Sequence, residues 1–127
     1  MVDVWMDGVK VIAVLDPGAT HTCVPWEFLP SSAVTRSLDL TTYAANGTEI
    51  AMQAEADIQF RIGSKDYVWT AWVTDQVDQF LLGLDWFVAS DVQWNFNDTK
   101  NIIIAGESVP IRLRYLKNQC RHFYLAE

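Results

Sequence analysis

Tight-turn dipeptides divide this chain into short apolar segments, and their spacing constrains the fold more than any other feature. Asp7-Gly8 and Asn46-Gly47 are the strongest turn signals, because both residues of each pair tolerate a positive φ angle. The segments Val2–Met6 and Val9–Leu15 flank the first dipeptide, which predicts a β-hairpin. Val9–Leu15 is apolar on nearly both faces, so we expect that strand to be buried on both sides.

The remaining apolar segments are also typical of strands, so the chain is predicted to be all-β. Residues 56–62 alternate between apolar and polar side chains, and Tyr67–Val73 is aromatic and β-branched. These two segments are expected to pair across Gly63-Ser64. The other predicted elements are a strand at Phe80–Leu82, a helix of about two turns at Leu84–Ser90, and β segments at Val92–Phe96 and Ile102–Ile104.

Composition places the chain among single globular domains. Its 127 residues are 50% hydrophobic and 20% charged, which is enough to form one buried core. No apolar run approaches the roughly 20 residues of a membrane helix, and the first residues lack the basic start and apolar core of a signal peptide. We therefore expect a protein that neither enters a membrane nor is secreted, with Cys23 and Cys120 as free thiols.

Charge is unevenly distributed along the chain. Residues 1–99 hold four basic and fourteen acidic side chains, whereas residues 100–127 have a net charge of +3. An acidic body argues against nucleic acid as a partner, because phosphate binding needs a basic face. We predict a domain over residues 1–111, followed by a basic C-terminal strand or linker over residues 112–127.

The strongest candidate for chemistry is Asp16, which directly follows the apolar segment Val9–Leu15. A carboxylate there is drawn toward the interior, which raises its pKa, while backbone N–H groups of the turn at Gly18 can hold its ionised form. The same pattern also occurs where an Asp merely begins a Pro-Gly turn. The residues alone leave both interpretations open.

Two motifs in this order make the chain resemble the retropepsin-like aspartic proteases, and among them the protease domains of gypsy-type retrotransposon polyproteins. The first motif is Ala13-Val14-Leu15-Asp16-Pro17-Gly18-Ala19-Thr20-His21-Thr22, similar to the family's apolar residues followed by Asp-Thr-Gly-Ala or Asp-Ser-Gly-Ala. The second is Leu81-Leu82-Gly83-Leu84-Asp85-Trp86. The resemblance covers roughly residues 1–110, and Pro17 departs from it, because the family has Thr or Ser there.

The resemblance implies a retropepsin-like closed barrel with a flap hairpin and one short helix, and an aspartic endopeptidase without a cofactor. The sequence holds one such Asp motif, so the resemblance implies a homodimer in which each chain supplies one Asp16. It further implies a peptide or polyprotein substrate, and a location in the cytoplasm or within a retroelement particle.

The resemblance also assigns roles to individual residues. Asp16 is the catalytic residue, in an active-site loop formed by Pro17, Gly18 and Ala19, and the Gly18 N–H orients its carboxylate. Leu82 and Gly83 support this loop from below. The flap that closes over an extended substrate comprises Ala44, Ala45, Asn46, Gly47 and Thr48.

Two alternative functions remain open at this point. One is a catalytically impaired retropepsin-fold module for dimerisation or peptide binding, which Pro17 favours. The other is an unrelated β-sandwich binding domain. Asp85 lies at the start of the predicted helix, so we expect its side chain to form the N-terminal cap of that helix and to take no part in the chemistry.

Histidine and cysteine suggest two further kinds of site, neither of which is favoured. His21, Cys23, Cys120 and His122 could form a zinc set, but ligands spaced one residue apart on a strand suit a tetrahedral centre poorly. Cys23 could act as a nucleophile with His21 as base, although nothing in the sequence places the histidine in the position of a base. The Asn46-Gly47-Thr48 and Asn97-Asp98-Thr99 sequons are interpreted as turns.

Overall fold

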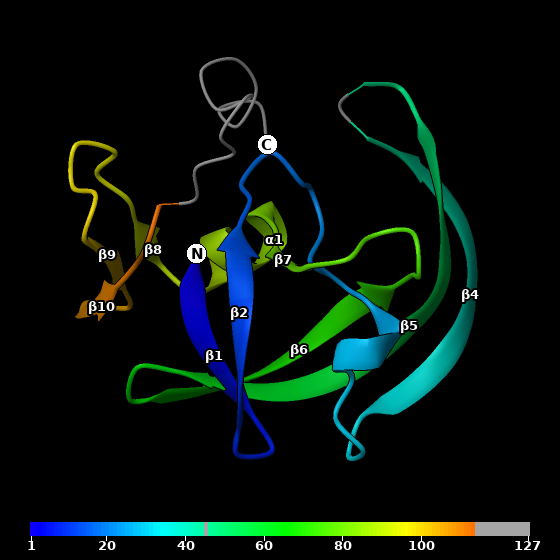
Figure 1. Cartoon of the computed structure of the whole chain (residues 1–127), viewed down its shortest axis with the longest axis horizontal. Helices are drawn as coiled ribbons and strands as arrows, with labels where there is room; N and C mark the ends of the chain where they lie inside the picture. The colour runs from blue at the N-terminus through cyan, green and yellow to red at the C-terminus, as the bar shows by residue number, and fades with distance from the viewer. Residues whose placement is uncertain (45, 114–127) are drawn as a thin grey trace.

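The computed structural model describes residues 1–44 and 46–113, which form a β-rich domain with one short α-helix (Figure 1). The helical elements are the 3-10 turn η1 (Trp26–Phe28) and the helix α1 (Leu84–Ala89). The strands are β1 (Val2–Met6), β2 (Val9–Leu15), β3 (Cys23–Val24), β4 (Val34–Tyr43), β5 (Glu49–Ile62), β6 (Lys65–Val73), β7 (Phe80–Leu82), β8 (Val92–Gln93), β9 (Asn101–Ile104) and β10 (Glu107–Pro110). No helix among the described residues is long and apolar enough to cross a membrane.

Seven strands form one sheet, and six of them close into a barrel. The strand order is β1-β2-β7-β3-β6-β5-β4, and β1 also pairs with β5 through Trp5 and Arg61. This extra pairing closes the sheet on itself and leaves β4 outside the ring, paired with β5. The predicted all-β closed barrel with one short helix is therefore confirmed. A separate sheet of β8, β9 and β10 lies beside the barrel (Figure 1).

The β1–β2 hairpin forms as predicted. Asp7 and Gly8 both have positive φ angles, of 50° and 77°, which suits a two-residue turn between twisted strands. The expectation that β2 is buried on both faces is wrong for its first half, since Val9 is 62% and Ile12 45% exposed. Val9 borders the hairpin turn, which projects from the lower end of the barrel (Figure 1), and Ile12 lies on the face of β2 opposite to the buried Ala13 and Leu15.

The alternating segment of β5 supplies much of the core. Its apolar side chains point into the barrel and are at most 3% exposed; they are Ala56, Ile58, Phe60 and Ile62. The strand begins earlier than residues 56–62, because Met52 and Ala54 continue the same buried face. This long β5 pairs with β6 at one edge and with β4 at the other, and Figure 1 shows β4 and β5 rising together as a curved ribbon.

One predicted segment near the C-terminal end is shorter in the structure than in the prediction. The β segment predicted at Val92–Phe96 stops at Gln93, because the side chain of Asn95 accepts a hydrogen bond from the Asn97 N–H and turns the chain. Arg112 lies against the first strand, where its side chain contacts Asp3 at 2.7 Å. Most of the predicted basic segment, residues 114–127, lies outside the described residues.

Candidate active site

Asp16 lies where β2 ends, beside the end of β7. The two strands run parallel, with Leu15 opposite Leu82, and the Asp16 N–H donates to the Leu82 carbonyl at 2.9 Å. The residue is only 6% exposed. The loop after Asp16 is therefore attached to the barrel at its first residue.

Backbone N–H groups of the following turn hold the Asp16 carboxylate. Its Oδ1 atom accepts hydrogen bonds from the N–H of Gly18 at 3.1 Å and of Ala19 at 3.3 Å. The Asp16 carbonyl also accepts from the Ala19 N–H at 3.1 Å, which closes the turn. Two amide donors on one oxygen favour the ionised carboxylate and fix its orientation.

Pro17 occupies the exposed part of this turn. Proline has neither a side-chain hydroxyl nor a backbone N–H, so it offers no hydrogen-bond donor from the loop. Gly18 and Ala19, the two residues that follow Pro17, donate their N–H groups to Asp16.

Leu82 and Gly83 are predicted to support the active-site loop. The Leu82 carbonyl accepts the Asp16 N–H, and Gly83 lies against the backbone of Ala19 and His21. A Cβ atom at Gly83 would come within 2.8 Å of the His21 carbonyl oxygen and 2.9 Å of that of Ala19. Such contacts are shorter than packed carbon atoms tolerate, so only glycine fits without displacing the loop. The next residue, Leu84, donates its N–H to the Ala19 carbonyl at 2.8 Å.

Asp85 does not cap the helix, and that prediction is wrong. Gly83 takes the N-cap position of α1, and Asp85 belongs to the first turn. Its Oδ1 atom instead accepts hydrogen bonds from both the N–H and the hydroxyl of Thr22, each at 2.9 Å. Its Oδ2 atom accepts from the indole N–H of Trp69 at 2.9 Å. Sequence reasoning missed this cluster, because it joins residues far apart in the chain.

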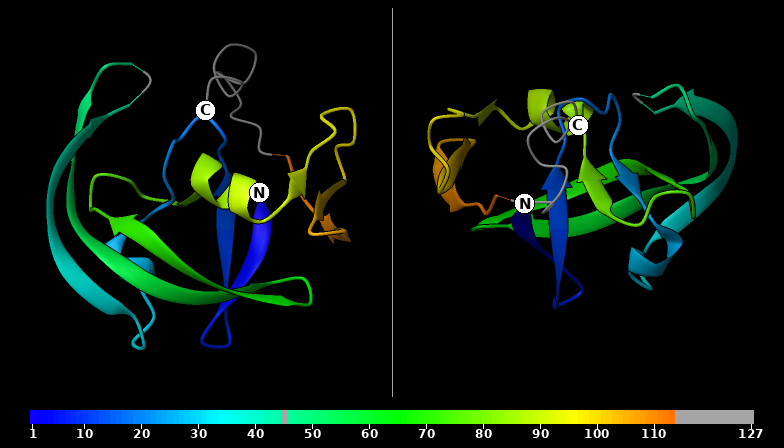
Figure 2. Two further views of the ribbon diagram at one scale, coloured as in Figure 1. Left: turned by 180° about the vertical axis from the view of Figure 1, so that it is seen from behind. Right: turned by 45° about the horizontal axis from the view of Figure 1, so that its top comes forward.

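The predicted flap forms the turn between β4 and β5. Ala44 donates its N–H to the Thr48 carbonyl at 2.8 Å, and Gly47 has a φ angle of 84°. The Asn46 side chain accepts from the Thr48 N–H at 3.0 Å, while Ala45 lies outside the described residues. Figures 1 and 2 show this turn and the loop after β2 at the same end of the domain.

Hydrogen bonds connect the first part of β5, called here the flap arm (residues 49–53), to the segment between β6 and β7. β5 pairs with β6 only as far as Ala54, so the next part of its edge has no strand beside it. There the Ala51 N–H donates to the Gln76 side chain at 2.7 Å, and the Thr74 hydroxyl donates to the Ala51 carbonyl at 2.8 Å. From η1, the Trp26 indole N–H donates to Gln53 Oε1 of β5 at 2.6 Å. These contacts fix the base of the flap.

The thiol-nucleophile hypothesis is wrong for Cys23. Burial, and to a lesser extent the nearby carboxylates of Asp85 and Asp16, raises the pKa of this thiol to about 12, so it stays protonated at neutral pH. His21 is not its base, because the imidazole stacks on Trp72 with ring centroids 3.9 Å apart. The thiol instead donates to the His21 carbonyl at 3.4 Å.

The zinc hypothesis involves residues that the structure only partly covers. Cys120 and His122 lie outside the described residues. Over residues 1–44 and 46–113, no three His, Cys, Asp or Glu side chains gather closely enough to hold a metal ion.

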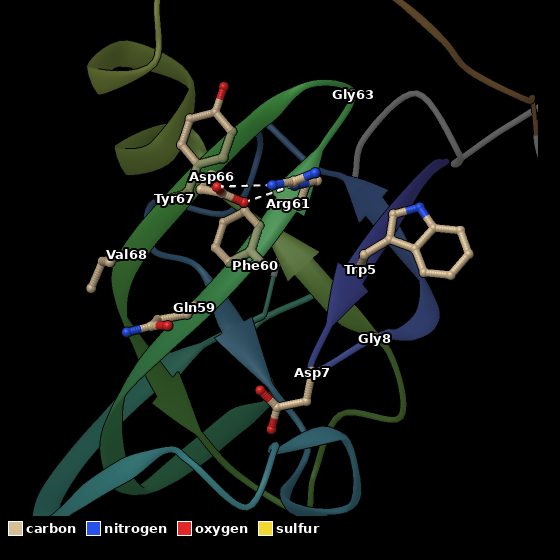
Figure 3. Close-up of a pocket in the computed structure, with 10 residues that line it drawn as sticks. All are labelled: Trp5, Asp7, Gly8, Gln59, Phe60, Arg61, Gly63, Asp66, Tyr67 and Val68. Carbon is tan, nitrogen blue, oxygen red and sulfur yellow. Dashed lines mark hydrogen bonds and ion pairs between the residues drawn. The ribbon is translucent and has the colours of Figure 1, made fainter.

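A surface groove of about 760 Å³ lies away from Asp16, on β1, β5 and β6 (Figure 3). Within it, Arg61 and Asp66 form a two-point ion pair, with contacts of 2.9 and 3.1 Å. None of the predicted active-site residues lines this groove, which is formed by Trp5, Asp7, Gly8, Gln59, Phe60, Arg61, Gly63, Asp66, Tyr67 and Val68.

Comparison with known proteins identifies a family and a fold. The family of gag-polyprotein putative aspartyl proteases matches residues 2–88, a span that includes Asp16, the flap and Gly83. The fold is similar to the crystal structure of the retroviral protease-like domain of Ddi1 from Leishmania major, with a TM-score of 0.58 and 11% identity over 93% of this chain and 94% of that one. No curated protein sequence matches the chain. The family match covers more than half of the chain, which therefore belongs to the gag-polyprotein putative aspartyl protease family.

Proposed function

We propose that this chain is one half of a homodimeric aspartic endopeptidase. The observation that carries the proposal is the Asp16 carboxylate, which two backbone N–H groups hold at the end of β2 in a chain of an aspartyl protease family. One chain provides one such motif, whereas activation of water by this chemistry needs two carboxylates. A second copy related by a two-fold axis supplies the other.

The proposed mechanism follows from two carboxylates that share one proton. They cannot both ionise cheaply when they are in contact, so one is ionised and the other is protonated. The ionised Asp16 takes a proton from water as the water oxygen bonds to the peptide carbonyl carbon. The protonated Asp16 gives its proton to the carbonyl oxygen. The C–N bond of the resulting diol then breaks, and the proton taken from water passes to the departing amine. One hydroxyl of the diol gives its proton to the other, now ionised, Asp16, which leaves a carboxylic acid product and restores the shared proton.

The substrate in this proposal is a peptide bound as an extended strand. The turn between β4 and β5, which holds the predicted flap, lies at the same end of the domain as the loop after β2, so its closure would cover a peptide between them. We propose that this peptide belongs to a retroelement polyprotein, processed in the cytoplasm or within a particle. The family description, which names gag-polyprotein proteases, supports this substrate.

Pro17 favours a second candidate function, a dimerisation or peptide-binding module with impaired catalysis. In the family that the sequence resembles, the residue at this position contributes a hydroxyl to the loop of the partner chain, and proline cannot. Such a module would keep the dimer and the peptide site but cleave slowly or not at all.

A peptide-cleavage assay at acidic pH, with Asp16→Asn as its control, distinguishes the two functions. The Asn side chain keeps the shape of Asp16 and removes its proton chemistry. Loss of about 10²–10⁴-fold in the Asn variant supports the peptidase, because general acid–base catalysis contributes that much. Equal rates for both proteins, at the level of uncatalysed hydrolysis, would support the impaired module.

A further inference from the structure

We propose that Asp85 is a positioning residue of the active site. Its ionised carboxylate holds Thr22, which ends the active-site loop that begins at Asp16, against β6. The proposal rests on the proposed function only in calling this loop catalytic. Asp85 touches no reacting atom in this account and acts through Thr22 and the loop.

The Asp85 carboxylate meets donors on both of its oxygens. Oδ1 accepts two hydrogen bonds from Thr22, and Oδ2 accepts one from the Trp69 indole. The Nδ1 atom of His21 lies 3.5 Å from Oδ2. The Asp85 side chain is 19% exposed, so water competes little for these bonds. An ionised carboxylate accepts hydrogen bonds and donates none, so it matches the three donors from Thr22 and Trp69.

Thr22 transmits the position of Asp85 to the segment beneath the loop. Thr22 is fully buried, and its hydroxyl donates to Asp85 while accepting the N–H of Gly83 at 3.1 Å. A hydroxyl has one proton, so the bond to Asp85 turns its lone pairs toward Gly83. Asp85 thus fixes the position of Thr22, at the end of the loop, relative to Gly83, which lies against the backbone of Ala19 and His21.

The active-site loop is consequently anchored at both ends. It begins where the Asp16 N–H bonds to Leu82 and ends where Thr22 bonds to Asp85. Between these anchors, the Ala19 carbonyl accepts from Leu84, and the Ala19 N–H donates to the Asp16 carboxylate. Release of the second anchor would let the Ala19 amide move away from Asp16, and the carboxylate would lose the hydrogen bond from that amide.

An asparagine at position 85 tests this role, because it keeps the shape and adds an N–H₂ group. If its oxygen faces Thr22, its nitrogen faces the donating indole of Trp69; if it turns over, its nitrogen faces the Thr22 N–H. Neither orientation satisfies every partner. Trp69→Phe removes the competing donor, so Asp85→Asn is expected to do much less damage in that background.

The measurement is amide hydrogen exchange, resolved by residue, in wild type, Asp85→Asn, Trp69→Phe and the double variant. We expect Asp85→Asn to speed exchange of the Ala19 and Thr22 amides by about tenfold or more, as expected for an unsatisfied buried group. Exchange of Ile58 in β5 should stay within about twofold. The double variant should recover most of the protection. Asp66→Asn is the matched control, because Asp66 is an exposed carboxylate paired with Arg61, and it should leave Ala19 unchanged.

Several outcomes would overturn the proposal. Faster exchange at Ile58 by the same factor as at Ala19 would mean that Asp85 only stabilises the whole domain. A double variant as unprotected as Asp85→Asn would contradict the donor conflict. If Asp85→Asn does not fold, Thr22→Val and Thr22→Ser test the same contact from its other side. Thr22→Val should speed exchange of the Ala19 amide, whereas Thr22→Ser should keep it slow. Equal exchange rates in the two variants would overturn the proposal.

Activity provides an independent readout. We expect Asp85→Asn to lower kcat of peptide cleavage by about tenfold or more with KM nearly unchanged, because the flap contacts remain. An unchanged kcat would contradict positioning. Absence of cleavage by the wild-type protein would contradict the proposed function alone, because the exchange measurement needs no substrate.

Discussion

The backbone of His21 occupies the space that a side chain on Gly83 would need. A Cβ atom at position 83 would lie 2.6 Å from the carbonyl carbon of His21. Both residues belong to constrained backbone, because Gly83 is the N-cap of α1 and His21 lies shortly before β3. The contact joins the two sequence motifs, which are separated by about sixty residues.

Gly83→Ala is therefore expected to displace the active-site loop. Overpacking at a fixed backbone costs about 1–3 kcal/mol in the free energy of unfolding, and the shift reaches Ala19 and Asp16. Urea denaturation and peptide cleavage should both show a loss. Gly8→Ala is the control, because nothing lies within 4 Å of its added methyl group. That variant should lose about 1–2 kcal/mol from its positive φ angle and keep its cleavage rate. Normal cleavage by Gly83→Ala would contradict the packing described for this loop.

Gln76→Ala should loosen the base of the flap without unfolding the barrel. The variant removes the acceptor of the Ala51 N–H at the edge of β5 that β6 leaves uncovered. We expect amide exchange at Ala51 to accelerate by about tenfold, as for loss of one hydrogen bond, while Ile58 stays protected. Gln59→Ala, an exposed change on the same strand, should alter neither amide. Unaltered exchange at Ala51 would show that the Gln76 side chain does not fix the flap arm.

Cys23 should be chemically inert in the folded protein. Its pKa is raised from 9.0 to about 12, so the reactive thiolate is scarce at pH 8. In a Cys120→Ser background, iodoacetamide should label native Cys23 at least about 100-fold more slowly than the urea-unfolded chain. Cys23→Ser should also retain peptide cleavage. Fast labelling of the native protein would contradict both the burial and the raised pKa of this thiol.

Pro17→Thr is expected to strengthen the proposed dimer. The added hydroxyls would contribute two hydrogen bonds per dimer by symmetry, each worth about 0.5–1.5 kcal/mol. Loss of the rigid proline offsets about 0.4–1 kcal/mol of this gain. The dimer dissociation constant should therefore fall, by at most about a hundredfold, as sedimentation equilibrium can measure. Cleavage should rise at low protein concentration and change little at saturation. A weaker dimer in the threonine variant would show that Pro17 is itself adapted to the interface.

Local patterns in the sequence were sufficient to predict part of this fold. The hairpin at Asp7-Gly8 and the alternating core of β5 depend on neighbouring residues, and both predictions are confirmed. β4 was not predicted, because its ten residues are almost all exposed and lack an apolar alternation. β10 was missed as well, although the turn before it has positive φ angles at Ala105 and Gly106.

The supports of the site were harder to predict than its central residue. Asp16 stands out because a carboxylate follows a strongly apolar strand. Asp85 was interpreted as a helix cap, since an acidic residue in a first turn commonly has that role. Its true partners, Thr22 and Trp69, lie 63 and 16 residues away, and no local pattern indicates such contacts. The same holds for Gln76 and Ala51.

The central claim is that two copies of Asp16, one from each chain, form a single catalytic site. Mixing wild-type protein with Asp16→Asn at constant total concentration tests this claim most directly. If chains exchange freely and both carboxylates are required, activity follows the square of the wild-type fraction. An equal mixture should then retain about one quarter of the activity of wild type alone. Retention of about one half would mean that each chain acts through its own Asp16, and would contradict the shared site.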